Sequence, residues 1–149
     1  MAIPNNILGS DPGLQAWSIF RGYRGSIAHG MYVPPTDPNS IDDKDVIGVC
    51  IPPPPYYIGL ESYGSRGTIE IKKDQWDIVV YEFLKFVRLL IQGNPNVLCT
   101  MWLPDKSVLW KNEAWDLLLE NRQLFVGRHV YRSFMGYAFG QLHRMTHMA

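Results

Sequence analysis

The chain has 149 residues, of which 46% are hydrophobic and 19% are charged, and its formal net charge at pH 7 is zero. This composition predicts one globular domain with a hydrophobic core and excludes a wholly disordered chain. A net charge of zero also provides no overall basic field of the kind that marks many nucleic-acid-binding domains.

The N-terminal residues 1–13 lack the charged and apolar regions of a signal peptide, and their prolines and glycines predict an irregular lead-in. The most apolar stretch, residues 79–91, is too short and too charged to span a bilayer. We therefore expect a cytoplasmic protein that makes no membrane contact. The two cysteines, Cys50 and Cys99, have apolar neighbours and are predicted to be buried free thiols.

The first half of the chain predicts two strands separated by a loop. A short strand is predicted over residues 16–20, and one helical turn over residues 27–31. The proline-rich residues 32–41 predict a loop. The nearly continuous apolar run at 45–51 predicts a buried strand, and the prolines at 52–55 end it because proline cannot donate to a β-ladder.

The second half predicts one strand followed by helices. Polar and apolar residues alternate over residues 68–72, which predicts a strand with one solvated face. Apolar residues at spacings of three and four predict a helix over 78–92, and the Gly-Asn-Pro sequence at 93–95 would stop it. Two further helices are predicted, over residues 113–120 and 127–147.

The last predicted helix carries a set of basic and small residues near one face. Its two glycines would let another surface approach closely, either a neighbouring helix or a phosphate group, and we favour helix packing. The residues on this face are His129, Arg132, Gly136, Gly140, His143 and His147.

Two short motifs point to chemistry. Gly25 and Ser26 follow the first predicted strand, and Asp43 and Asp45 stand at the start of the next. Residues i and i+2 of a strand share one face, so the two carboxylates are expected to lie together, as oxygen ligands suited to Mg²⁺. The glycine would let the backbone approach a phosphate. Each motif alone is also common in plain turns, solvated loops and helix caps.

Taken in order along the chain, these motifs resemble nucleotidyltransferases of the DNA polymerase beta superfamily. The match narrows to the RNA-repair-pathway DNA polymerase beta family through four further segments. They are residues 43–49, 77–86, 93–98 and 131–142. The resemblance covers about residues 19–144 and implies an α/β (α+β) fold, with a small mixed sheet, flanking helices and C-terminal helices.

The resemblance also implies a function and a set of site residues. A metal-dependent nucleotidyltransferase would move a nucleoside monophosphate from an NTP such as ATP to a hydroxyl acceptor. Gly25 and Ser26 would bind the nucleotide, while Asp43, Asp45 and Asp77 would bind Mg²⁺ or Mn²⁺ and act in catalysis. Asp74 and Glu70 are the alternatives for the third carboxylate. The acceptor, whether nucleic acid, protein or small molecule, and the oligomeric state stay open.

The chain departs from the family pattern in two places. Cys99 stands where relatives have an acidic residue, and relatives continue with further helices after residues 140–142. We therefore expect one nucleotidyltransferase-like domain over 1–149, with a catalytic core at 14–98 and a shortened helical part at 99–149. The alternative is a non-catalytic nucleotide-binding or antitoxin-like interaction protein that keeps the fold.

Overall fold

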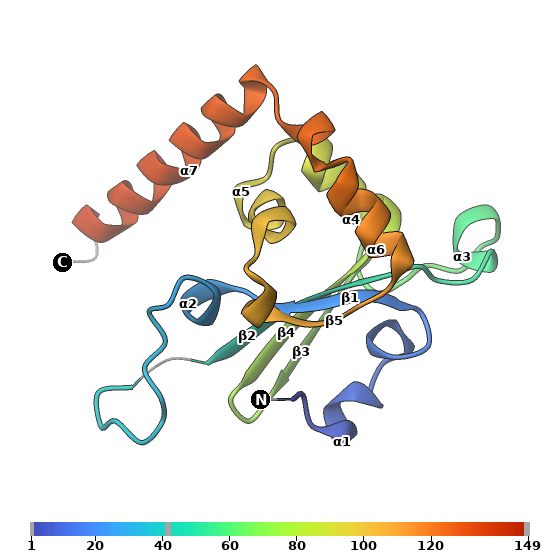
Figure 1. Cartoon of the computed structure of the whole chain (residues 1–149), viewed down its shortest axis with the longest axis horizontal. Helices are drawn as coiled ribbons and strands as arrows, with labels where there is room; N and C mark the ends of the chain where they lie inside the picture. Colours follow the sequence, from blue (N-terminus) through green and yellow to red (C-terminus); the bar gives the residue numbers. More distant parts are fainter. Residues whose placement is uncertain (1, 41–42, 148–149) are drawn as a thin grey trace.

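Five strands form the centre of the fold in this computed structural model, which describes residues 2–40 and 43–147 (Figure 1). The strands lie in the order β3-β4-β2-β1-β5, with β2 and β4 parallel and the other neighbours antiparallel. Their bounds are β1 (Ser18–Tyr23), β2 (Lys44–Cys50), β3 (Thr68–Lys73), β4 (Trp76–Glu82) and β5 (Val108–Lys111). The predicted α/β class with a small mixed sheet is confirmed.

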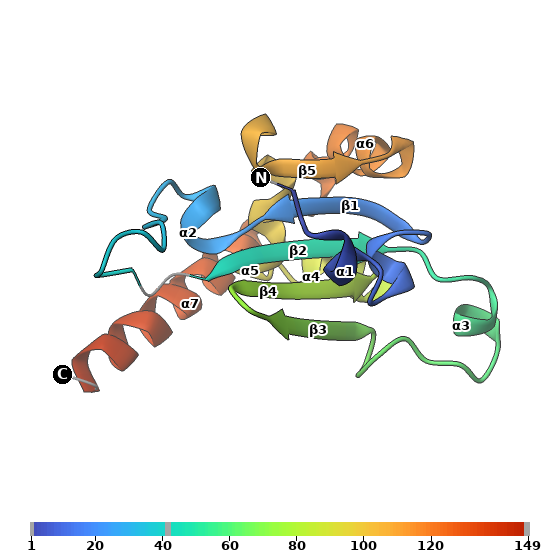
Figure 2. The same ribbon diagram turned by 90° about the horizontal axis from the view of Figure 1, so that it is seen from below.

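The N-terminal segment covers one face of this sheet and lies in front of β2 in Figure 2. It contains the short helices α1 (Asn5–Leu8) and η1 (Pro12–Leu14), so the predicted irregular lead-in is wrong at these two turns. Ile7 and Leu14 are buried in the same cluster as Val46 and Ile78 of the sheet. These apolar side chains, spaced among the prolines and glycines, hold the segment against the strands.

Helices cover the opposite face of the sheet (Figure 1). They are α4 (Phe83–Ile91), α5 (Pro95–Leu98), η2 (Cys99–Trp102) and α6 (Glu113–Glu120). The helix predicted over 113–120 is thereby confirmed. The centre of this second core is a stack of Phe20 on Trp115, whose ring centroids lie 3.8 Å apart. Asn112 caps α6 by accepting hydrogen bonds from the backbone N–H groups of Ala114 and Trp115.

The helix predicted over residues 78–92 is wrong in its first part. Residues 78–82 belong to strand β4, and helix α4 begins only at Phe83, where the Glu82 side chain accepts a hydrogen bond from the Leu84 N–H. Ile78, Val79 and Val80 are β-branched and buried on both faces of the sheet, between β2 and β3. Burial on both faces produces a continuous apolar run, which periodicity does not distinguish from helix.

The remaining elements differ from expectation mainly in their bounds. Strand β1 continues to Tyr23, beyond the predicted end at residue 20, and helix α2 (Gly25–Ala28) begins earlier than the predicted turn at 27–31. The strand predicted over 68–72 is confirmed as β3. Three short helices complete the chain up to residue 125: α3 (Pro55–Ile58), η3 (Asp105–Ser107) and η4 (Arg122–Phe125).

The C-terminal helix α7 (Arg128–His147) projects away from the sheet (Figure 1). It has no buried residue, and a side chain placed at Gly136 or Gly140 would meet nothing within 4 Å. Packing of this glycine face against another helix, which the sequence favoured, is therefore wrong. Contact with the rest of the fold is made near the helix start, where His129 lies against Gly93. No helix in the described ranges is long and apolar enough to cross a membrane.

Candidate active site

Two carboxylates occupy paired positions on the parallel strands at the centre of the sheet. Asp45 of β2 is in register with Asp77 of β4. Paired residues on neighbouring strands lie on the same face, and the strands are about 4.8 Å apart. By the alternation along each strand, this is the face of Ile47 and Val79, which the helices cover. The sheet therefore brings together two of the three predicted metal ligands.

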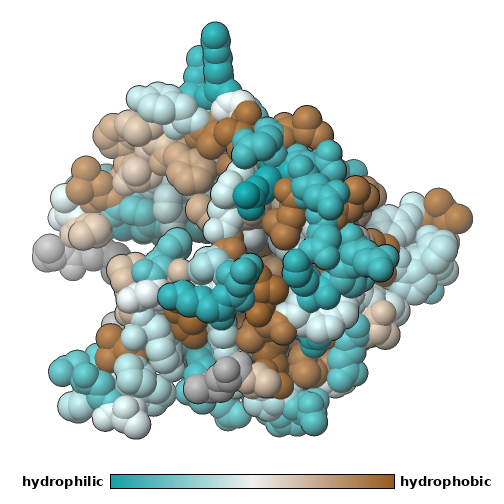
Figure 3. Space-filling model, viewed as in Figure 1, coloured by the Kyte–Doolittle hydropathy of each residue, from teal (hydrophilic) through white to brown (hydrophobic). Residues whose placement is uncertain are grey.

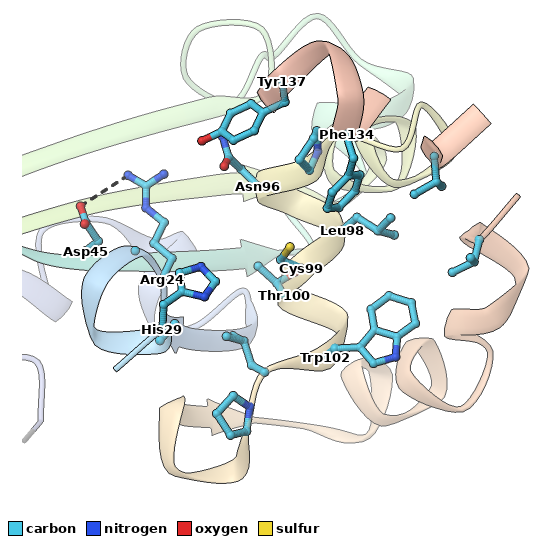
Figure 4. Close-up of a pocket in the computed structure, with 17 residues that line it drawn as sticks. Arg24, His29, Asp45, Asn96, Leu98, Cys99, Thr100, Trp102, Phe134 and Tyr137 are labelled. Atoms are coloured by element: carbon cyan, nitrogen blue, oxygen red, sulfur yellow. Dashed lines mark ion pairs between the residues drawn. The ribbon is translucent and has the colours of Figure 1, made fainter. Parts of the chain in front are cut away.

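Basic side chains neutralise this pair of carboxylates. The Arg24 Nη2 atom lies 3.9 Å from Asp77 Oδ1. It lies 4.0 Å from Asp45 Oδ1, the contact drawn as a dashed line in Figure 4. From strand β3, the Lys72 Nζ atom lies 3.3 Å from Asp77 Oδ2. The backbone N–H of Arg24 also donates to the carbonyl oxygen of Asp45 at 3.0 Å, which fixes the start of the Arg24 side chain beside β2.

Gly25 follows directly and approaches the Asp45 carboxylate closely. Its φ of +60° lies in the left-handed region, and a Cβ atom at this position would collide with Asp45 Oδ2. Only glycine fits both constraints. Ser26 is the next residue in α2 and is half-buried, and its carbonyl oxygen accepts a hydrogen bond from the Met31 N–H at 2.8 Å. The role of Ser26 in nucleotide binding stays a prediction.

Asp43, the other predicted ligand, lies immediately before β2 and is exposed. Because the strand begins at Lys44, the alternation that placed Asp43 and Asp45 on one face does not extend to Asp43. Lys44 itself is buried and lies over the Trp76 ring at 5.0 Å, on the opposite face of the sheet from Asp45. The role of Asp43 in metal binding stays a prediction.

The two alternatives for the third carboxylate lie farther along the sheet. Asp74 is an exposed residue of the β3–β4 turn, with a φ of 54°. Glu70 is exposed on β3, the edge strand, where it pairs with Val79 of β4. Among these candidates, Asp77 is therefore the one that the sheet places next to Asp45.

The carboxylate pair fits a magnesium ion by its chemistry. Mg²⁺ is commonly bound through one or two carboxylates, with waters and substrate phosphates completing its coordination. Asp45 and Asp77 offer such oxygens from neighbouring strands, and the pair already attracts the Arg24 cation. Across residues 2–40 and 43–147, no group of three His, Cys, Asp or Glu side chains is arranged to hold a metal. The fit is therefore that of a two-carboxylate site.

A pocket of about 890 Å³ opens beside this pair. Its volume is in the range of small-molecule sites, and most of its walls are apolar, as such sites usually are. The space-filling view shows the surface hollowed below α7 (Figure 3). The wall residues from the first half of the chain are Arg24, Gly25, Ala28, His29 and Asp45, and those from the second half include Asn96, Leu98, Cys99, Trp102, Phe134 and Tyr137.

The pocket has a polar side and an aromatic side. Arg24, His29 and Asp45 lie on one side, and α7 contributes Phe134 and Tyr137 on another, with the Tyr137 hydroxyl directed toward the Arg24 side (Figure 4). This arrangement suits a ligand that carries a charged group joined to a planar apolar one. A nucleotide has this form.

Cys99 contributes a thiol to the pocket wall. It is exposed, so its predicted burial is wrong, whereas Cys50 is buried as predicted and both are free thiols. The apolar neighbours of Cys99 in the sequence indicated a core position, but η2 begins at this residue and directs its side chain to the pocket. Although the residue is exposed, neighbouring atoms partly desolvate the Cys99 thiol and raise its pKa, so the thiol stays protonated near neutral pH.

Sequence reasoning missed Arg24 and the aromatic wall. The position of Arg24 directly before Gly25 was a local signal, but its contact with Asp77 depends on the pairing of β2 with β4. The contribution of Phe134 and Tyr137 depends on the angle at which α7 leaves the sheet. Neither of these arrangements can be recognised from the spacing of residues within a single helix or strand.

The sequence model of the RNA repair pathway DNA polymerase beta family matches residues 15–149, which is most of the chain. No curated protein and no solved structure matches the chain significantly.

Proposed function

The chain belongs to the RNA repair pathway DNA polymerase beta family, and on this premise we propose that it is a metal-dependent nucleotidyltransferase. Membership indicates nucleotidyltransferase-type activity. The proposed reaction transfers a nucleoside monophosphate from an NTP to a hydroxyl group of an acceptor. A bond forms between the acceptor oxygen and the α-phosphorus, the bond from the α-phosphorus to the bridging oxygen breaks, and pyrophosphate leaves with the electron pair. The hydroxyl proton would pass to the Asp77 carboxylate, the group that the family resemblance implies helps to activate the hydroxyl.

The observation that carries this proposal is the paired placement of Asp45 and Asp77 on neighbouring strands, with Asp45 lining the pocket. Phosphoryl transfer needs little covalent chemistry from the protein, because most of the catalysis comes from positioning and from neutralising charge on the phosphates. A divalent metal bound to the pair would supply that neutralising charge. Asp45 also lines the pocket, so the pair lies within reach of a ligand there.

The residues around the pair would contact the other parts of the substrate and the metal. Gly25 leaves room for the Asp45 carboxylate to face the ligand. Ser26 would hydrogen-bond the triphosphate, and Asp43 would join the metal ligands when the substrate is bound, as the family resemblance implies. The aromatic side of the pocket, with Phe134 and Tyr137, would contact a planar group of the nucleotide or of the acceptor.

The test measures binding first and transfer second. We would titrate the protein calorimetrically with Mn²⁺ and a non-hydrolysable ATP analogue, comparing wild type with Asp45→Asn and Asp77→Asn. Asp116→Asn is the matched control, because it removes a carboxylate that pairs with Lys111 on the surface. We expect binding in wild type and in Asp116→Asn, and a loss of at least about tenfold in the two site variants, because each loses a charged ligand.

The transfer step is tested with the four NTPs labelled on the α-phosphate. Each is incubated with Mg²⁺ or Mn²⁺ and with pools of nucleic acid, protein or small hydroxyl compounds. Label appearing in one acceptor pool, with release of pyrophosphate, supports the proposal. Binding without transfer to any pool would favour a non-catalytic nucleotide-binding protein instead. Equal binding by wild type, Asp45→Asn and Asp77→Asn would contradict the metal site.

A further inference from the structure

Arg24 joins the carboxylate pair to the pocket. One nitrogen of its guanidinium lies 3.9–4.0 Å from oxygens of both Asp45 and Asp77, and the same side chain lines the pocket wall. In the view of Figure 4, the guanidinium lies between Asp45 on one side and Asn96 and Tyr137 on the other. Arg24 is therefore placed to contact either the pair or a ligand in the pocket.

The contact of Arg24 with the pair is a loose one. A strong arginine–carboxylate pair uses two parallel hydrogen bonds with N···O distances of about 2.7–2.9 Å. Here a single nitrogen lies about 4 Å from each carboxylate. The Arg24 Nε atom is buried and has no hydrogen-bond partner in the described part of the chain. The guanidinium is thus held by charge, and its Nε–H donor has no acceptor in this arrangement.

A divalent cation and Arg24 would compete for the same oxygens. Mg²⁺ binds carboxylate oxygens at about 2.0–2.1 Å and carries two charges, so its attraction to the pair exceeds that of a guanidinium at about 4 Å. The two cations would also repel each other. The Arg24 side chain is 29% exposed, so it has room to turn away from the pair when the pair is occupied.

We propose that Arg24 is a positioning residue that neutralises Asp45 and Asp77 in the free protein and turns to the nucleotide phosphates when a divalent cation binds the pair. This inference rests on the proposed function. Its consequence is that metal and nucleotide bind cooperatively, because metal binding releases the guanidinium and phosphate binding keeps it away from the pair.

The chemistry of arginine suits the proposed contact with the nucleotide phosphates. The guanidinium is planar and bonds phosphate oxygens through two parallel N–H groups, a geometry that lysine cannot reproduce. Two other basic groups lie nearby. His29 lines the pocket but has no ion pair with either carboxylate in the structure, and Lys72 pairs with Asp77 without lining the pocket. Among the three basic residues Arg24, His29 and Lys72, Arg24 is the one that both lies beside the carboxylate pair and lines the pocket.

The test separates the two roles by calorimetry on the full chain. We would compare Arg24→Gln with wild type, using Mn²⁺ alone and then a non-hydrolysable ATP analogue at saturating Mn²⁺. We expect Arg24→Gln to bind Mn²⁺ alone several-fold more tightly, because the competing cation is gone. It should bind the analogue about 10- to 100-fold more weakly, because one charge-assisted interaction with phosphate is lost.

Two further variants make the result specific. Lys72→Gln also removes a positive charge beside Asp77 but does not alter the pocket wall, so it should leave affinity for the analogue near that of wild type. Arg24→Lys should bind Mn²⁺ alone like wild type and recover only part of the affinity for the analogue. On wild type, the NMR signal of the Arg24 Nε–H group should shift during a Mg²⁺ titration and shift again when the analogue is added.

The outcomes distinguish this inference from the proposed function. If Arg24→Gln weakens Mn²⁺ binding, or leaves both affinities unchanged while Asp45→Asn abolishes them, the inference is wrong and the metal site stands. If wild type binds neither Mn²⁺ nor the analogue, both proposals are wrong. If Arg24→Gln does not fold, an Nε–H signal that stays unchanged throughout the titration of wild type overturns the inference.

Discussion

Gly25 and Asp45 approach each other so closely that a side chain at position 25 would overlap the Asp45 carboxylate. The approach is possible because Gly25 has a φ of +60°, which turns the chain from β1 into α2 directly beside β2. Any residue other than glycine would have to displace one of the two carboxylates of the central pair. The geometry of the site therefore depends on a position without a side chain.

Gly25→Ala should disturb the site more than the fold. Alanine in the left-handed region destabilises by about 1–2 kcal/mol, and the new methyl group would also move Asp45, so we expect Mn²⁺ affinity to fall at least about tenfold. Gly30→Ala is the matched control, because Gly30 has a φ of +72° but open space around it. Thermal unfolding and calorimetry separate the two effects. Equal loss of Mn²⁺ binding in both variants would contradict a specific role for Gly25.

The aromatic wall supplied by α7 should affect binding more than stability. Phe134 and Tyr137 line the pocket and are 37% and 41% exposed, so we expect truncation of either to alanine to lower the free energy of unfolding by only about 1 kcal/mol, as at the similarly exposed Trp110. We expect Phe134→Ala and Tyr137→Ala to weaken binding of a non-hydrolysable ATP analogue about 5- to 100-fold if a base stacks there. Phe139→Ala, on the same helix but outside the pocket wall, should bind like wild type. Wild-type affinity in all three variants would exclude a base at this wall.

Cys99 should serve as a chemical reporter of the pocket. Partial desolvation raises its pKa above the ordinary value of 9.0, so at pH 8 it holds less thiolate than an unfolded chain, and iodoacetamide should modify it slowly. The rate should rise as pH increases past 9. Cys50 is buried, and burial raises its pKa to about 12, so it should not react in the folded protein.

Mass spectrometry of the modified peptides checks this expectation. Cys99→Ser should abolish labelling, and bound nucleotide should slow labelling of wild type if it fills the pocket that Cys99 lines. Rapid modification of Cys99 at pH 7, or modification of Cys50 before unfolding, would contradict the described environments.

Trp115 should be the most costly of the tryptophans to remove. It is 1% exposed and stacks on Phe20, so Trp115→Ala should reduce the free energy of unfolding by about 3–5 kcal/mol. Trp110→Ala is the comparison, because Trp110 is 39% exposed and makes a cation–π contact with Arg21 near the surface. We expect it to lose about 1 kcal/mol. Urea denaturation of the two variants would measure the difference, and similar losses would contradict the assigned core.

Local patterns in the sequence determined much of the fold and the family. The continuous apolar run ending at the prolines predicted β2, alternation predicted β3, and the sequence also predicted the helices α6 and α7. The order of the motifs predicted the family, which the comparison confirms. These features are short-range, because each depends on residues a few positions apart in one element.

The tertiary structure decided the features that depend on pairing between distant segments. Residues 78–82 have helical spacing, yet burial between β2 and β3 makes them a strand, and that strand sets Asp77 beside Asp45. The contact of Arg24 with Asp77 follows from the same pairing. The glycine face of α7 shows the converse: its spacing indicated packing, but no described residue lies within 4 Å of a side chain placed at Gly136 or Gly140. Spacing describes one element, whereas register and the faces that meet are set by long-range burial.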